Sequence, residues 1–197
     1  MRKIVIIALL LLSGVMIAQN KRILSGDFKN LKGITGFNLV FDYTNLKVDK
    51  FETEEAFLED KMKKREAKGT AEDFKKSWFL DREERYEPKF IESFNKRFDG
   101  KIKADKNLSS AKYTAKIQTL WIYPGYNVGV VRQPSKLNAI IKIFEIENPD
   151  NVILSVGYEK VLGDGAAGFD YNSGYRISEA YAKLAKEFAR EMKKANK

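Results

Sequence analysis

The chain has 197 residues, with 36 Lys and Arg against 27 Asp and Glu, a net charge of +9, and neither His nor Cys. This composition excludes disulfides, zinc sites built on Cys or His, and catalysis by a Cys nucleophile or a histidine acid–base group. A hydrophobic content of 44%, with 12% aromatic residues, is too high for a disordered chain.

The N-terminus has the layout of a secretory signal peptide. A basic pair, Arg2-Lys3, opens a stretch that is almost wholly apolar through Ala18, and polar residues follow. We therefore predict a cleaved signal peptide over residues 1–18, a single domain over residues 19–197, and a periplasmic or secreted location. An uncleaved N-terminal anchor is the alternative, although the apolar stretch is shorter than the about 20 residues of a membrane span. Without a Cys there is no lipobox, and a bacterial lipoprotein anchor is excluded.

Strand and helix patterns alternate in the first half of this domain. Residues 36–43 place Phe37, Leu39, Phe41 and Tyr43 on one face of a predicted strand, and residues 46–49 form a short second strand. A charged helical insert over residues 52–99 follows. Its predicted features are an N-cap at Thr53, a capping box at Thr70, an interruption at Pro88, and apolar stripes that include Phe74, Trp78, Phe90 and Phe94.

The second half predicts a β-meander over residues 111–162. Alternation in the first strand places Trp121 and Tyr123 on the same core face as Ile117. Residues 137–146 are apolar on both faces, so we expect the helices of residues 71–98 to cover the face opposite the C-terminal helix. That amphipathic helix is predicted over residues 178–194, capped by Ser178. The fold class is α+β: an antiparallel sheet of about four strands, a C-terminal amphipathic helix, and a helical insert after the first strands.

Three patterns suggest chemistry but fit a structural role better. Gly163 to Gly168 matches G-x-G-x-x-G, yet no helix begins within the motif, as a dinucleotide site requires. Asp164, Asp170 and Asn172 offer oxygens without the spacing of an EF-hand. The carboxylate pairs Glu54-Glu55 and Glu83-Glu84 are typical of solvated helix faces. We predict no catalytic, cofactor or metal site, and that the chain is not an enzyme.

Two features favour contact with a partner. Tyr126 and Arg132 lie in the turn region after the strand of residues 111–123, and they are the predicted partner-contact residues. The basic end of the last helix suits an acidic partner or a weak contact with an anionic membrane surface, although the helix dipole alone also favours cations there. Export argues against a nucleic-acid partner.

The stretch of residues 111–192 resembles a group of Gram-negative envelope proteins. The features that carry the resemblance are residues 111–117, the apolar strand of residues 139–146, the Asn148–Asn151 turn, the glycine-bearing loop and the helix around residues 181–186. The group comprises auxiliary lipoproteins of ABC-type transporters, the curli-secretion lipoprotein and relatives, all similar to the TolB amino-terminal domain. The resemblance implies an assembly or transport accessory that binds partners; it supplies no catalytic residues. The missing lipobox Cys and the insert of residues 52–99 depart from the pattern.

These observations favour an exported, non-enzymatic accessory protein that binds an envelope partner. The alternative is a carrier that holds a lipid or another apolar ligand between sheet and helices, since 13 Phe and 9 Tyr give a large aromatic surface. A carboxylate-based hydrolase is less favoured, because nothing in the sequence arranges two carboxylates in one site.

Overall fold

The computed structural model describes residues 20–164 and 172–196. The predicted signal peptide and most of the glycine-rich loop, including Asp170, lie outside the described residues. The elements are, in chain order, β1 (Asn20–Gly26), η1 (Phe28–Leu31), β2 (Gly36–Asp42), β3 (Lys47–Val48), α1 (Glu54–Lys63), η2 (Glu66–Lys68), α2 (Ala71–Asp81), η3 (Arg82–Tyr86), α3 (Glu87–Asn95), β4 (Lys103–Asp105), β5 (Tyr113–Tyr123), β6 (Tyr126–Asn127), β7 (Arg132–Gln133), β8 (Ser135–Glu145), β9 (Val152–Gly163) and α4 (Ser173–Ala195).

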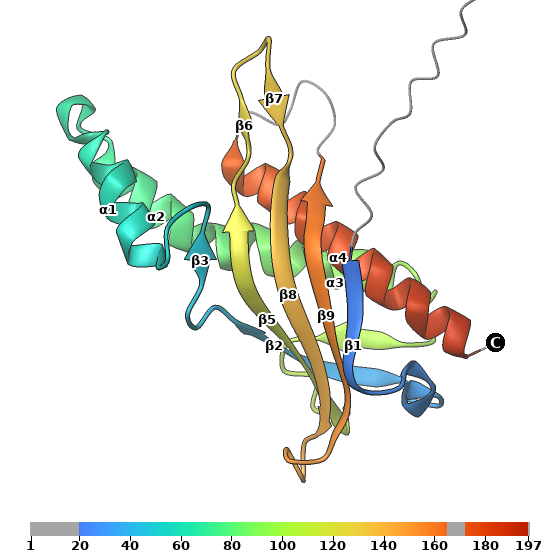
Figure 1. Cartoon of the computed structure of the whole chain (residues 1–197). Coiled ribbons are helices and arrows are strands. Elements are labelled where there is room, and N and C mark those ends of the chain that lie inside the picture. Colours follow the sequence, from blue (N-terminus) through green and yellow to red (C-terminus); the bar gives the residue numbers. More distant parts are fainter. Residues whose placement is uncertain (1–19, 165–171, 197) are drawn as a thin grey trace, which may run out of the picture.

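Over the described residues, the main sheet has seven strands rather than the predicted number of about four. Its order is β1-β9-β8-β5-β2-β4, and β3 pairs with β5 at the far end of that strand. The predicted antiparallel meander is confirmed as β5-β8-β9, with the β6–β7 hairpin extending from one end of the sheet (Figure 1). However, β2 pairs in parallel with both β5 and β4, and β1 pairs with β9, so the sheet is mixed.

The helices α3 and α4 lie side by side on one face of the sheet (Figure 1). Buried Ile141 and Val156 face them from the sheet, and buried Phe94 of α3 stacks on Phe188 of α4. The α+β class with a C-terminal helix packed on the meander is thus confirmed. The expectation that the insert covers the opposite face of residues 137–146 is wrong, because α3 packs beside α4 instead. Ile140 on that opposite face is only partly buried.

A β-bulge changes which side chains of β5 face the core. The pairing of β5 with β8 shifts register between Thr119 and Trp121, and beyond it Ile122 is the buried residue. Because one extra residue reverses the alternation, Trp121 and Tyr123 are turned away from the core and only partly buried. Their predicted core placement is wrong. Trp121 instead donates its indole N–H to the Asp49 carbonyl over 2.8 Å.

The insert begins as the sequence predicts and then departs from it. Thr53 caps α1, since its hydroxyl accepts from the Ala56 amide, but Thr70 makes no side-chain cap bond to α2. Pro88 does not interrupt the helix. A π-helical turn, η3, links α2 directly to α3, and Pro88 sits in the first turn of α3. A proline within a helix has no amide N–H to donate and crowds the carbonyl four residues earlier. For Pro88 that carbonyl lies within η3, so the wider π-helical turn is placed where the crowding occurs.

The C-terminal helix starts five residues earlier than predicted. Asn172 is the N-cap, and its side chain accepts from the Tyr175 amide, whereas Ser178 lies inside α4 and donates to the Tyr175 carbonyl. Within the two described ranges, no helix is long and apolar enough to cross a membrane.

An ion pair on the open face of the sheet makes stability depend on acid pH. Burial raises the pKa of Asp42, but hydrogen bonds from Lys116 and Thr44 outweigh it and lower the pKa from 3.8 to about 2. A lowered pKa contributes stability that is present above the unfolded-state value of about 4 and is lost as the pH falls towards 2. Asp42→Asn removes this titrating group. The free energy of unfolding of the variant should therefore fall less steeply between pH 4 and 2 than that of the unsubstituted protein, as measured by urea titration at each pH. An unchanged pH profile would contradict the pairing.

Candidate binding cleft

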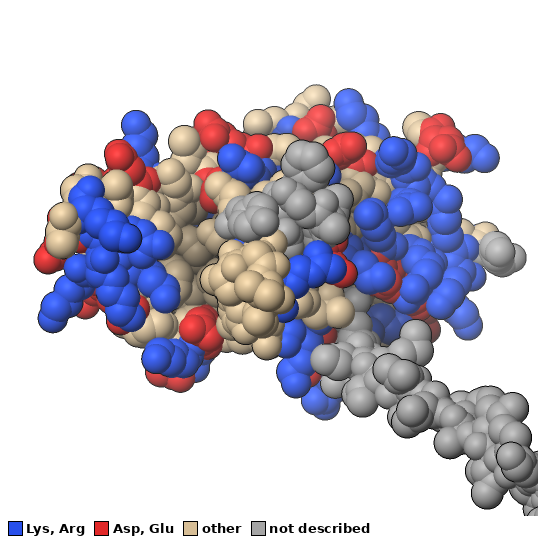
Figure 2. Space-filling model, turned by 90° about the horizontal axis from the view of Figure 1, so that it is seen from above, with Lys and Arg blue, Asp and Glu red and all other residues tan. Residues whose placement is uncertain are grey.

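A cleft of about 490 Å³ separates the α1–α2 helical pair from the ends of β5 and α4. Side chains and backbone from four separate parts of the chain line it. They are Asp49, Phe57, Lys61, Lys64, Arg65, Phe74, Trp78, Tyr123, Pro124, Gly125, Tyr126, Asn127, Ser173 and Arg176. Figure 2 looks down on this end of the molecule and shows Lys and Arg gathered over the α1–α2 end, to the left of the tan centre.

Cations and aromatic rings alternate on the helical wall of the cleft. The Arg65 guanidinium lies over the Phe74 ring at 4.2 Å, and the Lys61 ammonium lies over the Phe57 ring at 5.4 Å. Such pairs hold a long cationic side chain against an apolar surface while its charged end stays accessible. Together with Lys64, the wall presents three cations, and Asp49 across the cleft is the sole carboxylate among the described lining residues.

The floor of the cleft is held by a largely buried ion pair. Trp78 donates its indole N–H to a Glu54 carboxylate oxygen at 2.5 Å, and Arg82 donates to the same carboxylate. The side chains of Arg82 and Glu54 are 19% and 10% exposed. Charge-assisted bonds in this setting fix the Trp78 ring against Phe57, with ring centroids 4.8 Å apart. The position of the Trp78 ring in the floor therefore depends on the Glu54 carboxylate.

The opposite rim depends on Arg176 and Gly125. Buried Arg176, in the first turns of α4, donates to the Pro124 and Gly125 carbonyls at 3.1 Å each. Gly125 has φ +66°, and a Cβ there would meet the Gln133 carbonyl oxygen at 2.4 Å, so only glycine permits this turn. The turn directs the chain into β6, where Tyr126 borders the cleft.

Of the two predicted contact residues, one lines the cleft and the other does not. Tyr126 and Arg132 lie on paired strands of the β6–β7 hairpin, as Tyr126 pairs with Gln133 and Arg132 with Asn127. Tyr126 lines the cleft, whereas Arg132 does not and lies 4.0 Å from Asp164. Sequence reasoning missed the helical wall, because it assigned Phe74 and Trp78 to apolar stripes that pack on the sheet and gave the nearby Lys and Arg residues no binding role. It also gave Arg176 no role.

The carboxylate pairs singled out in the sequence do not meet in a site. Glu54 is bound by Arg82 and Trp78, and Glu87, the other deeply buried carboxylate of the insert, accepts from Lys106 at 2.5 Å. In the part of the chain that the structure describes, no three acidic residues are grouped so as to hold a metal ion. The arrangement can bind an anion next to a flat or apolar group, and it presents no pair of carboxylates for acid–base chemistry.

Comparisons with protein-family models, with curated proteins and with solved structures find no match for this chain.

Proposed function

We propose that the chain is an exported, non-enzymatic binding protein that holds a negatively charged, partly apolar segment of an envelope partner in this cleft. The observation that carries the proposal is the composition of the described lining, which holds four cations and five aromatic rings but one carboxylate, Asp49. Asp60 pairs with Lys61 and Lys64 from outside this lining, so the cations still outnumber the carboxylates around the cleft. Cations supply attraction and orientation, and aromatic side chains supply most of the contact energy in protein interfaces.

Two further observations support binding rather than the alternatives. A hydrolase that works with carboxylates needs two of them around its substrate, and Asp49 stands alone in the described lining. A carrier would need space between the sheet and the helices. There, Phe188 packs directly on Phe28 and Phe94, and the facing Ile141 and Val156 are fully buried. The export and the envelope location rest on the sequence pattern of residues 1–18 and on the resemblance of residues 111–192.

The cleft is tested by site-specific photo-crosslinking in the cells that produce the protein. A benzophenone amino acid at position 126 should crosslink a protein partner. The same group at position 79 should not, although Phe79 on α2 is 40% exposed against 39% for Tyr126. Phe79 is a matched control because it is aromatic, equally accessible and outside the cleft lining. Equal crosslinking at both positions would contradict the proposal.

Charge reversal on the helical wall tests the chemistry of the partner. Lys61→Glu with Lys64→Glu should lower the yield of the crosslink at position 126 about tenfold, which corresponds to about 1.4 kcal/mol. Lys63→Glu with Lys68→Glu changes the same charge on exposed residues outside the lining and should leave the yield within about twofold. A similar loss in both pairs would show a general effect of net charge and overturn the assignment to the cleft.

A further inference from the structure

A second surface, near the other end of α4 from the cleft, carries more cations than the cleft does. A shallow groove of about 590 Å³ lies between the end of α3 and the C-terminal half of α4. We call it the basic face; its lining consists of Arg97, Lys183, Lys186, Glu187, Arg190, Lys193 and Lys194. Figure 2 shows this second gathering of Lys and Arg at the end of the molecule opposite α1 and α2.

The cations of α4 follow one side of the helix. Lys183, Lys186, Arg190, Lys193 and Lys194 are spaced by three or four residues, with one adjacent pair, so they share a stripe. Over these residues the helix rises about 17 Å. The opposite side of the helix carries fully buried Leu184, Phe188 and Met192. The stripe therefore points away from the sheet, and Arg97 at the end of the helical insert widens it.

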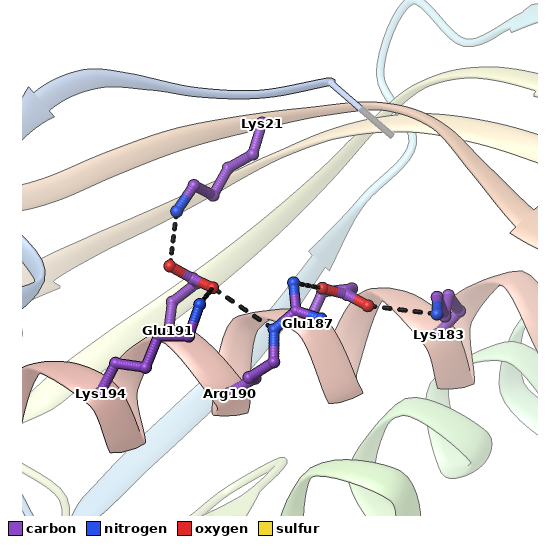
Figure 3. Close-up of polar contacts among 6 residues, drawn as sticks. All are labelled: Lys21, Lys183, Glu187, Arg190, Glu191 and Lys194. Carbon is purple, nitrogen blue, oxygen red and sulfur yellow. Dashed lines mark hydrogen bonds and ion pairs between the residues drawn. The ribbon is translucent and has the colours of Figure 1, made fainter. Parts of the chain in front are cut away.

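Two carboxylates lie among these cations and are joined to them by ion pairs (Figure 3). Glu187 accepts from Lys183 at 3.2 Å and pairs with Arg190, while Glu191 accepts from Lys21 at 2.6 Å and from Lys194 at 3.0 Å. The two Glu side chains are 12% and 13% exposed, whereas Lys183, Arg190 and Lys194 are 49%, 58% and 63% exposed. The carboxylates thus orient the cations, and the cations form the outer layer.

The face keeps an excess of positive charge over the physiological pH range. Burial raises the pKa of Glu191, but hydrogen bonds from Lys21 and Lys194 lower it from 4.5 to about 2. Even with Glu187 and Glu191 both ionised, the six cations of the groove together with Lys21 leave a net charge of +5 on this surface. An uncompensated charge of this size attracts a polyanion rather than a neutral partner.

Three features favour an anionic bilayer over other polyanions as the binding partner of the basic face. Ile23 lies two residues from Lys21 on the same side of β1 and is 46% exposed, so an exposed apolar side chain neighbours Lys21 at the edge of this surface. Among the described residues that line the groove there is no aromatic ring on which a nucleobase would stack. The signal peptide predicted at residues 1–18 also directs the chain to a compartment where anionic headgroups, not nucleic acids, are the abundant polyanions.

We propose that the basic face docks the protein on an anionic bilayer surface, with Lys183, Lys186, Arg190, Lys193, Lys194 and Arg97 contacting phosphate groups of the headgroups. The cleft lies near the other end of α4, so a docked molecule keeps it open to a partner. This surface is separate from the cleft, and the two proposals stand or fall independently.

Vesicle sedimentation tests the docking surface. The full-length protein is purified from its producing cells, its N-terminus is read by mass spectrometry, and it is mixed with phosphatidylcholine vesicles or with vesicles containing about one third phosphatidylglycerol. We expect binding to the anionic vesicles alone, lost at about 0.5 M salt because screening shortens the reach of the charges. An apolar N-terminal segment that remained uncleaved would bind both kinds of vesicle at any salt, so the charge dependence isolates the basic face.

A matched pair of triple variants tests the residues. Arg97→Gln, Lys186→Gln and Lys193→Gln together should weaken partition onto anionic vesicles about 100-fold, as each lost cation costs about fivefold. Lys63→Gln, Lys68→Gln and Lys75→Gln remove the same charge from exposed positions on the helical insert and should change partition no more than about threefold. Equal losses in the two variants overturn the proposal. So does tighter binding to a short DNA duplex than to the anionic vesicles in competition.

Discussion

Replacing Phe188 by alanine is expected to lower the free energy of unfolding by about 3–5 kcal/mol, the usual range for deleting a buried phenylalanine. Phe188 is 1% exposed, and its ring lies 5.8 Å from Phe28 of η1 and 6.0 Å from Phe94 of α3. It therefore joins three elements that are far apart in the sequence, and its removal leaves a cavity where they meet. Urea titration followed by circular dichroism measures the loss.

Two companion variants keep this result interpretable. Phe188→Leu retains most of the buried volume and should cost about 1–2 kcal/mol. Phe79→Ala removes the same group from a ring that is 40% exposed and should cost under about 1 kcal/mol. A loss below about 1 kcal/mol for Phe188→Ala would mean that α4 does not pack on α3 and the sheet as described.

Replacing Arg82 by methionine is expected to lower the free energy of unfolding by about 3 kcal/mol. Among the described residues, the change leaves the Trp78 indole as the one remaining partner of the Glu54 carboxylate, which is 10% exposed. A nearly buried charge without an opposite charge beside it is costly. Arg82 also covers the Tyr43 ring at 4.3 Å, and methionine retains part of that apolar contact. Because the same carboxylate holds Trp78, the fluorescence of Trp78 should shift as well.

A double-mutant cycle separates the pair from its surroundings. Glu54→Gln should rescue at least about 1 kcal/mol of the loss caused by Arg82→Met, since the two residues interact directly. The exposed pair of Lys64 with Asp60 is the control, and Lys64→Met should cost under about 0.5 kcal/mol. Additive losses for Glu54 and Arg82 would show that the pair does not couple, and would contradict the ion pair described at the floor of the cleft.

Local patterns in the sequence predict many of the elements. Alternating apolar residues predict β2, β5, β8 and β9, and the 3.6-residue period of Leu184, Phe188 and Met192 predicts α4. The N-cap of α1 is also predicted, because the side chain of one residue, Thr53, forms it. The edge strands β1 and β4 carry no such pattern, because residues 21–26 of β1 are all exposed and the three residues of β4 are too few to show an alternation.

The sequence likewise predicts separate parts of the cleft but not how they come together. The four-residue spacing of Phe74 and Trp78 is visible in the sequence, and so is the turn around Tyr126. What the sequence does not show is that these two segments face each other across one cleft, with Arg176 of α4 joining the rim. The two segments come together because of how the insert packs against the sheet. No local pattern within either segment predicts that packing.

The sequence by itself determined the α+β class, the meander, the C-terminal amphipathic helix and the excess of positive charge, because composition and periodicity act within a few residues of the chain. Only the tertiary structure decided the parallel pairing of β2, the bulge that turns Trp121 outward, the cleft and the basic face. Backbone hydrogen bonds between strands are nearly the same for every residue type except proline, so pairing and register emerge from the packing of the whole core.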